Sequence, residues 1–359
     1  MLLSELTTMR VGGPAARLVD ATTRDQLVAA ARGAWADGDE WIVLGGGSNV
    51  VISDEGFDGT VIRALSRGIA QHEHGNAVRV EVQAGEPWDA VVDYAVANGL
   101  AGIEALSGIP GSSGAAPIQN IGAYGQELGD TLVSVEFLDY LTGEVEQLTA
   151  EHLGFGYRTS TLKRGREGVV LAIELELVAA SRGAVAYPQL AQALGVPLGT
   201  EVPLAQVRAS VLSLRAAKGM VLDPADPDSV SCGSFFTNPI VDENLARTLP
   251  MDAPRWPMVP DEPDVAVPLG QQPPERHDAG PRLVKLSAAW LIEHSGIGKG
   301  FALPGARAAI SSKHTLALTN RGGATAEQVA ELARFVQARV LAEFGITLVA
   351  EPVAIGLQL

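Results

Sequence analysis

The segment from residue 107 to residue 125, SGIPGSSGAAPIQNIGAYG, limits the possible folds more than any other stretch of this chain. It holds five glycines and two prolines in nineteen residues. Glycine lacks the Cβ that blocks positive φ and close approach of a ligand, and proline keeps the chain extended. Apolar residues at intervals indicate packing rather than a flexible linker, namely Ile109, Ile118, Ile121 and Tyr124. We therefore favour a rigid loop whose backbone N–H groups bind an anion such as phosphate over a purely structural array of turns.

A second glycine-rich turn, GGGSN at 45–49, separates apolar runs at 41–44 and 50–52. Val50 replaces the third glycine of the dinucleotide-binding pattern and no helical pattern follows, so the turn does not match that fingerprint. It also lacks the Gly-Lys-Ser/Thr ending of a P-loop. A ligand-binding loop and a tight β-hairpin explain it about equally well.

Composition excludes several classes of protein. The chain has 359 residues, of which 47% are hydrophobic, enough for two or three domains with their own cores. A net charge of −16 argues against a nucleic-acid partner or an anionic membrane surface, so any bound phosphate must be held locally. The lone cysteine, Cys232, excludes an internal disulfide, and the six histidines form no metal-binding pattern. We predict no metal.

Residues 1–20 lack a basic start followed by an apolar run, so we expect no signal peptide there, and no later apolar run approaches the ~18 residues that span a bilayer. We expect a cytoplasmic protein without membrane insertion.

Hydrophobic periodicity predicts an α+β fold. We expect strands at 41–44, 50–52, 77–83, 132–139, 144–148, 168–177, within 305–320 and at 347–359. We expect helices at 24–36, 87–98, 203–217, 283–296 and 326–343. Residues 249–281 are rich in proline and acidic residues without a sustained period, and they predict a mobile surface insertion rather than a helix or a central strand.

Four polar residues stand in unusual surroundings. Arg158 follows Gly-Phe-Gly-Tyr, and Ser234 lies between a glycine and two phenylalanines. For both, an ordinary structural role is the first interpretation, a salt bridge for Arg158 and a turn for Ser234. Glu351 interrupts an apolar terminal run, where a buried carboxylate is costly unless paired, so a functional role is equally plausible. Lys218 ends a predicted helix, where the helix dipole alone explains a cation.

Taken in order, GGGSN, SGIPGSSGAAPIQNIGAYG, GYRTS, GSFFTNP and EPV closely resemble the UDP-N-acetylenolpyruvoylglucosamine reductase (MurB) family of peptidoglycan synthesis. The resemblance runs from about Thr7 to the C-terminus and is interrupted mainly at 249–281. Because Tyr187 precedes the GSFF segment, the chain resembles the longer type, which closes a tyrosine-bearing loop over substrate.

The resemblance implies two FAD-binding subdomains of the p-cresol methylhydroxylase type, at 1–65 and 66–214, and a C-terminal α+β domain for the UDP-sugar at 215–359. It implies cofactor contacts from the two glycine loops and one arginine. These are Gly45, Gly46, Gly47, Ser48, Asn49, Ile109, Pro110, Gly111, Ser113, Gly114, Gln119, Asn120, Gly122, Ala123, Tyr124 and Arg215. Tyr187, Lys218 and Asn238 match the positions that hold the substrate diphosphate.

The implied activity is the FAD-mediated, NADPH-dependent reduction of UDP-N-acetylglucosamine enolpyruvate to UDP-N-acetylmuramate, with ping-pong kinetics, by a monomeric cell-wall enzyme. Hydride would pass from flavin N5 to C3 of the enolpyruvyl group, and Ser234 would give a proton to C2. Arg158 and Glu351 would lie against the substrate carboxylate and stabilise the enol-type intermediate. Two alternatives stay open: a flavin oxidoreductase of the same fold acting on an alcohol or sugar, and a non-catalytic flavin or nucleotide sensor.

Overall fold

The computed structural model describes residues 1–75, 77–258 and 282–359. Its N-terminal part carries a three-stranded parallel sheet in the order β1-β4-β2. These strands are β1 (Ala15–Ala21), β2 (Trp41–Leu44) and β4 (Phe57–Ala64). Helix α1 (Arg24–Asp37) begins at Thr23, whose side chain accepts from the Gln26 N–H. Its buried face, which includes Leu27 and Ala31, packs on Ile62 of β4.

The central part is a larger antiparallel sheet in the order β11-β10-β12-β6-β5, and β7 also pairs with β12. Its strands are β5 (Ile69–His74), β6 (Ala77–Gln83), β7 (Leu100–Ala101), β10 (Leu132–Asp139), β11 (Val145–Thr149) and β12 (Gly168–Ala179). The first half of β12 is apolar on both faces because Leu171 packs with the α1 cluster whereas Val170 packs with α2 (Trp88–Ala97).

Three short elements lie between strands of this sheet, namely β8 (Gly122–Ala123) and β9 (Gln126–Glu127) before β10, and α3 (Ala150–Leu153) between β11 and β12. Four further elements follow β12 and lead to the C-terminal part: β13 (Arg182–Ala184), α4 (Pro188–Leu194), β14 (Glu201–Pro203) and α5 (Leu204–Ala217). Helices α4 and α5 share a small core that contains Leu190, Val207 and Val211. Four 3-10 turns lie at Leu3–Glu5, Glu104–Leu106, Leu128–Asp130 and Pro227–Ser229.

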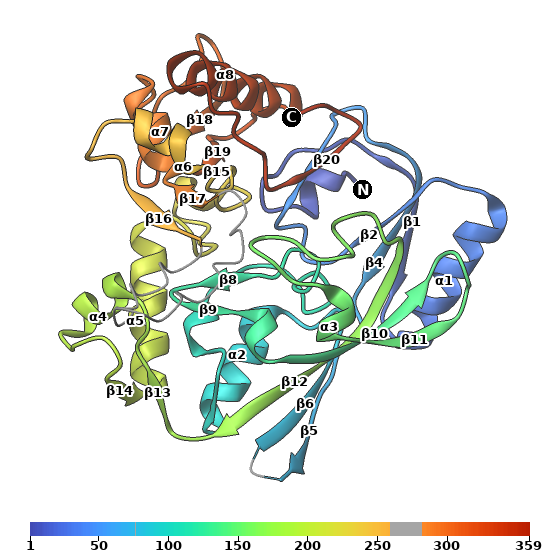
Figure 1. Ribbon diagram of the computed structural model, residues 1–359. Coiled ribbons are helices and arrows are strands. Elements are labelled where there is room, and N and C mark those ends of the chain that lie inside the picture. The colour runs from blue at the N-terminus through green and yellow to red at the C-terminus, as the bar shows by residue number, and fades with distance from the viewer. Residues whose placement is uncertain (76, 259–281) are drawn as a thin grey trace, which may run out of the picture.

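In the C-terminal part, the small sheet β15-β17-β16 and the pair β18-β19 pack with the long helix α8 in one hydrophobic core. The elements are β15 (Ile240–Asp242), α6 (Glu243–Thr248), β16 (Arg255–Pro257), β17 (Leu283–Leu286), α7 (Ala288–His294), β18 (Ala308–Ile310), β19 (Leu318–Asn320) and α8 (Ala326–Phe344). Figure 1 shows α7 and α8 at the opposite end of the molecule from the long strands β12, β6 and β5.

The chain end returns to the N-terminal part. Strand β20 (Val353–Ile355) pairs in parallel with β3 (Val50–Ile52). The carboxylate of Asp54 accepts from the Ala326 N–H at the start of α8. These contacts join residues some three hundred positions apart, so β20 lies beside the first glycine loop.

Most predicted elements are confirmed, and the α+β class is confirmed. The hairpin interpretation of GGGSN is wrong, because β2 pairs with β4 and β3 pairs with β20. The helix predicted at 283–296 begins only at Ala288, since 283–286 form β17. Strand structure at the chain end is limited to Val353–Ile355.

The proline-rich segment also needs a correction. Residues 255–257 form an edge strand on β17, a position that tolerates proline because one side needs no ladder hydrogen bond. The rest of the predicted insertion, 259–281, lies outside the described residues. Within the described part of the chain, no helix has both the length and the apolar character needed to cross a bilayer.

Candidate functional site

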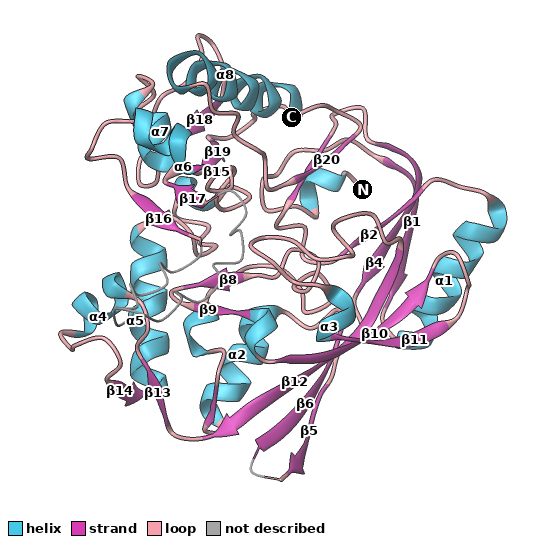
Figure 2. Cartoon of the chain, in the orientation of Figure 1, coloured by secondary structure: helices cyan, strands magenta, loops and turns pink. Residues whose placement is uncertain are grey.

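A cavity of about 960 Å³ opens where the two glycine loops, α5 and the C-terminal part meet. Figure 2 shows this region as loops between the large sheet and the C-terminal helices. Its volume lies at the upper end of the range for small-molecule sites. Residues 45–49 and 109–112 form one side, and residues from the C-terminal part, including Ser234 and Glu351, contribute to the other.

The glycines of the two loops are required by backbone packing. A Cβ on Gly46 would lie 2.7 Å from the Cα of Gly111. Gly47 and Gly111 have φ values of 61° and 115°, which favour glycine. The two glycine loops therefore contact each other directly, and this contact shapes the cavity wall.

Three non-glycine residues with left-handed backbone conformation lie close together here: two line the cavity, and the third accepts a hydrogen bond from one of them. Asn120, Tyr124 and Arg158 have φ values of 48°, 47° and 53°. The side chain of Asn120 fixes its own loop by accepting from the Gly129 N–H at 2.9 Å and donating to Glu127 at 2.9 Å. Such conformations cost energy and concentrate at functional sites.

Arg158 connects the second glycine loop to the end of the chain. Its Nη1 donates to the Asn120 carbonyl at 3.1 Å, and its Nη2 donates to the Gly122 carbonyl at 2.6 Å. The remaining nitrogen, Nε, lies 3.6 Å from Oε1 of Glu351. The guanidinium is thus held in one orientation at the cavity wall.

Ser234 and Glu351 are brought together by pairing of their two segments. The Glu351 N–H donates to the Phe235 carbonyl at 2.9 Å, and Phe236 and Ala350 form a β-bridge. Phe235 is fully buried, which anchors the segment that carries Ser234. Among the described residues, the Ser234 hydroxyl has no hydrogen-bond partner. It is therefore available to a ligand.

Burial sets the protonation of Glu351. Its side chain is 13% exposed, and burial raises the pKa of its carboxyl above the ordinary value. The positive charges of Arg158 and Lys163 oppose this rise. The carboxyl can therefore be neutral at a higher pH than an exposed glutamate.

A group of basic residues lines the cavity near α5. Lys218 donates to Gln189 at 2.9 Å and lies 5.7 Å from the ring centre of Tyr124. Tyr124 in turn makes an edge contact with Tyr187, with ring centres 5.6 Å apart. Burial lowers the pKa of Lys218, and Arg215 adds to the effect. A locally positive patch thus exists on a strongly acidic protein.

Arg215 carries a polar atom that lacks a protein partner. Its Nη2 donates to the Met220 carbonyl at 3.1 Å, but its buried Nε has no hydrogen bond within the described chain. A buried unsatisfied guanidinium nitrogen is costly. A ligand acceptor at this point would remove that cost.

The structure places most of the predicted site residues around one cavity. All three predicted catalytic residues, all three predicted substrate residues and most predicted cofactor residues line the large cavity. Gly114 lines an adjoining cavity instead. Ser113 and Asn120 line neither cavity. The Ser113 hydroxyl donates to the Glu86 carbonyl, so its side chain supports the loop from behind.

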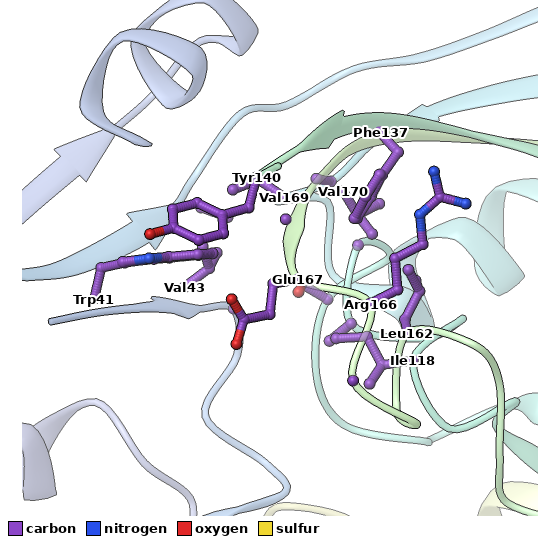
Figure 3. Close-up of a pocket in the computed structure, with 18 of the residues that line it drawn as sticks. Trp41, Val43, Ile118, Phe137, Tyr140, Leu162, Arg166, Glu167, Val169 and Val170 are labelled. Atoms are coloured by element: carbon purple, nitrogen blue, oxygen red, sulfur yellow. The ribbon is translucent and has the colours of Figure 1, made fainter. Parts of the chain in front are cut away.

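The adjoining cavity measures about 580 Å³ and shares Trp41, Val43, Gly45 and Ser112 with the large one. Trp41 and Tyr140 lie together on one side, with ring centres 5.7 Å apart. Ile118 and Leu162 lie opposite, and Glu167 lies between the two groups (Figure 3). Aromatic and aliphatic side chains with a charged group between them suit an aromatic ring with a polar substituent.

Comparison with known proteins agrees with this geometry. Residues 15–149 match the model of a FAD binding domain, and residues 224–355 match that of the UDP-N-acetylenolpyruvoylglucosamine reductase C-terminal domain. The UDP-N-acetylenolpyruvoylglucosamine reductase of Leifsonia xyli subsp. xyli is 61% identical over 99% of this chain and 98% of its own length. The chain belongs to the UDP-N-acetylenolpyruvoylglucosamine reductase family.

Other relatives of this reductase family support the same conclusion. The Salinispora arenicola enzyme of that name is 48% identical over 99% of this chain and 95% of its own length. The crystal structure of UDP-N-acetylenolpyruvylglucosamine reductase from Thermus caldophilus matches with a TM-score of 0.62 and 27% identity. It covers 99% of this chain and 97% of that chain.

Sequence reasoning missed several residues that line the reductase cavity, notably Lys163, Lys285 and His314. Lys285 lies 4.9 Å from the ring centre of Tyr157. Burial, together with the charges of Lys218 and Lys299, lowers the pKa of His314 to about 4. Of these three residues, only Lys163 could have been suspected from the sequence, because it lies five residues after Arg158. The sequence around His314, which follows Ser-Ser-Lys, favours an ordinary structural histidine over a ligand.

Proposed function

We propose that this chain reduces UDP-N-acetylglucosamine enolpyruvate to UDP-N-acetylmuramate, with bound FAD as cofactor and NADPH as electron donor. The observation that carries the proposal is the meeting of Arg158, Ser234 and Glu351, from three distant parts of the chain, in the cavity that both glycine loops line. A hydroxyl, a fixed guanidinium and a buried carboxyl are the groups that this reduction requires.

The chain's own residues fit FAD. The loops at 45–49 and 109–114 would hold its diphosphate through main-chain N–H groups, because their glycines expose the backbone. The adjoining cavity beside Trp41 and Tyr140 would hold the adenine. The unpaired Nε of Arg215 would find its acceptor on the bound cofactor.

The basic group near α5 fits the UDP part of the substrate. Lys218 and Tyr187 line the same side of the cavity as Arg215 and would contact the diphosphate. Asn238 is held in place because its Oδ1 accepts from the Ala288 N–H at 2.9 Å. Its amide nitrogen carries two N–H donors, of which one faces the Tyr157 hydroxyl and the other would donate to a phosphate oxygen.

When bound, FAD supplies the hydride that it has received from NADPH. Arg158 would hold the substrate carboxylate, since its guanidinium is already fixed by two carbonyl groups. Glu351, in its neutral form, would donate a hydrogen bond as negative charge develops on that carboxylate. Ser234 would then give its hydroxyl proton to C2. These three groups would therefore stabilise negative charge that develops on the substrate only during the reaction.

The finer parts of the proposal concern the donor, the assembly and the location. We propose NADPH as the reductant, a ping-pong order in which NADPH and the substrate use the same cavity in turn, and a monomer that acts in the cytoplasm. One cavity of about 960 Å³ lined by all three predicted catalytic residues supports the alternating order.

The visible spectrum of the purified protein tests this proposal. We expect a flavin spectrum that NADPH bleaches and that UDP-N-acetylglucosamine enolpyruvate restores under anaerobic conditions. Flavin reduced directly by an alcohol or sugar would support the alternative oxidoreductase. Colourless protein that takes up no FAD would contradict the assignment altogether.

A further inference from the structure

Lys163 lines the large cavity and contacts the main chain of Glu351. Its Nζ donates to the Glu351 carbonyl at 3.3 Å. The Nδ2 of Asn49, in the first glycine loop, donates to the same oxygen at 3.3 Å. The Glu351 N–H is bonded to Phe235. Both main-chain polar groups of Glu351 are therefore fixed, and Lys163 provides one of these contacts.

The loop that carries Lys163 is itself anchored. The Ser160 hydroxyl accepts from the Lys163 N–H at 3.2 Å and donates to the Ile118 carbonyl at 2.6 Å. The same loop carries Arg158, whose Nε faces the Glu351 carboxyl. One short loop thus presents two cations to Glu351, one to its side chain and one to its main chain.

The positive charge of the Lys163 ammonium has few partners in the described part of the protein. It is half-buried, and burial lowers the pKa of Lys163. In the described part of the chain, no carboxylate forms an ion pair with it, and one hydrogen bond serves its three N–H donors. Burial of a cation with so few partners costs stability. Its position is better explained by function than by folding.

We propose that Lys163 is a positioning residue of the reaction, whose ammonium fixes the Glu351 main chain and acts with Arg158 on the carboxyl of that residue. The inference rests on the proposed function, in which Glu351 contacts substrate. The charged and titratable groups that face Glu351 within the described chain are Arg158, Lys163 and Tyr157. Removal of the Lys163 charge leaves burial opposed by Arg158 alone.

The test uses the FAD-loaded protein and measures the two half-reactions separately. Lys163→Met is compared with Lys163→Arg, with wild type and with Arg164→Gln, which removes an exposed cation next along the chain that does not line the cavity. Stopped-flow absorbance follows flavin reduction by NADPH and its reoxidation by UDP-N-acetylglucosamine enolpyruvate at several pH values.

For Lys163→Met we expect unchanged FAD content, NADPH reduction within about twofold of wild type, and reoxidation slower by about 10- to 100-fold. Reoxidation needs neutral Glu351, so its rate falls as pH rises through the raised pKa of that carboxyl. Loss of a cation raises the pKa of Glu351 further, and the fall in rate moves to higher pH. Lys163→Arg restores most of the rate, and Arg164→Gln behaves as wild type.

The outcomes separate the two proposals. Wild-type protein that NADPH reduces but the enolpyruvyl substrate does not reoxidise would overturn the proposed function and this inference with it. If wild type is active, normal reoxidation in Lys163→Met with the fall at the same pH as in wild type overturns the inference alone. Equal slowing of flavin reduction and of flavin reoxidation in Lys163→Met also overturns the inference alone, because it shows that Lys163 has a general structural role.

A second pair of variants covers the case in which Lys163→Met folds poorly. Lys163→Gln is introduced into wild type and into Glu351→Gln. If Lys163 acts through Glu351, the substitution slows reoxidation in wild type but by less than about twofold in the Glu351→Gln background. Equal effects in both backgrounds overturn the inference.

Discussion

The Nε of Arg158 lies 3.6 Å from Oε1 of Glu351, while its two Nη atoms donate to carbonyls of the second glycine loop. One side chain therefore connects the loop that would carry the cofactor to the chain terminus that would contact the substrate. These three contacts fix the orientation of the guanidinium. The protein's own contacts fix this cation at the cavity wall, and preorganised charge of this kind stabilises a transition state.

Replacement of Arg158 should slow reoxidation of the flavin whether or not the new side chain keeps the positive charge. In Arg158→Ala, we expect reoxidation of the flavin by substrate to slow by about 10²-fold or more, because the fixed cation beside the substrate carboxylate is lost. Arg158→Lys should rescue little, since an ammonium cannot reproduce contacts to two carbonyls and a carboxylate in one plane. Stopped-flow kinetics measure both. A lysine variant as fast as wild type would show that charge alone matters.

Ser234→Ala should separate hydride transfer from proton transfer. The hydroxyl has no partner in the described structure, so its removal leaves no unsatisfied group and the fold should be unchanged. We expect normal FAD content and normal reduction by NADPH, with reoxidation slower by about 10²- to 10⁴-fold. Turnover that survives this substitution would contradict the role of Ser234 as proton donor.

The two glycine loops give a prediction about packing. Gly46→Ala places a Cβ 2.7 Å from the Cα of Gly111, so one backbone must move. We expect a loss of about 1–3 kcal/mol in the free energy of unfolding and weaker FAD binding. Gly33→Ala in α1 is the matched control, because no atom lies within 4 Å of its added Cβ. It should stabilise the protein by about 0.5–1 kcal/mol. Urea unfolding and flavin release measure the two effects.

How much of this could be predicted from sequence differs between residues. The glycine loops, Arg158, Ser234 and Glu351 stand in motifs whose composition is unusual, and their ordered set identifies the family. Lys163 and His314 stand in ordinary polar stretches, and the fold alone brings them to the cavity. Turn chemistry could not decide that β2 and β3 pair with distant strands, because GGGSN suits a hairpin equally well. The contact between Gly46 and Gly111 is likewise tertiary and has no local signature.

The ionisation of Glu351 predicts how the rate of reoxidation falls as pH rises. Burial raises the pKa of its carboxyl, so the neutral form that donates to substrate persists above the range of an exposed glutamate and is lost as pH rises through the raised value. Reoxidation by substrate should therefore slow as pH rises through the raised pKa of this carboxyl. In Glu351→Gln the amide cannot ionise, and we expect a slower rate without this fall. An unchanged pH profile in the variant would assign the ionisation to another group.

His314 predicts how stability depends on acid. Burial and the charges of Lys218, Lys299 and Arg215 lower the pKa of His314 to about 4, whereas Glu293 opposes them. Between pH 6.5 and about 4 the unfolded chain binds a proton at this position that the folded protein does not. The imidazole therefore contributes stability that is present above pH 6.5 and is lost as pH falls toward 4. In His314→Gln this loss should be absent, so the difference in free energy of unfolding between variant and wild type should change steadily across that interval. Urea unfolding at several pH values measures it, and a difference that stays constant from pH 7 to pH 4.5 would show that His314 protonates as an exposed histidine does.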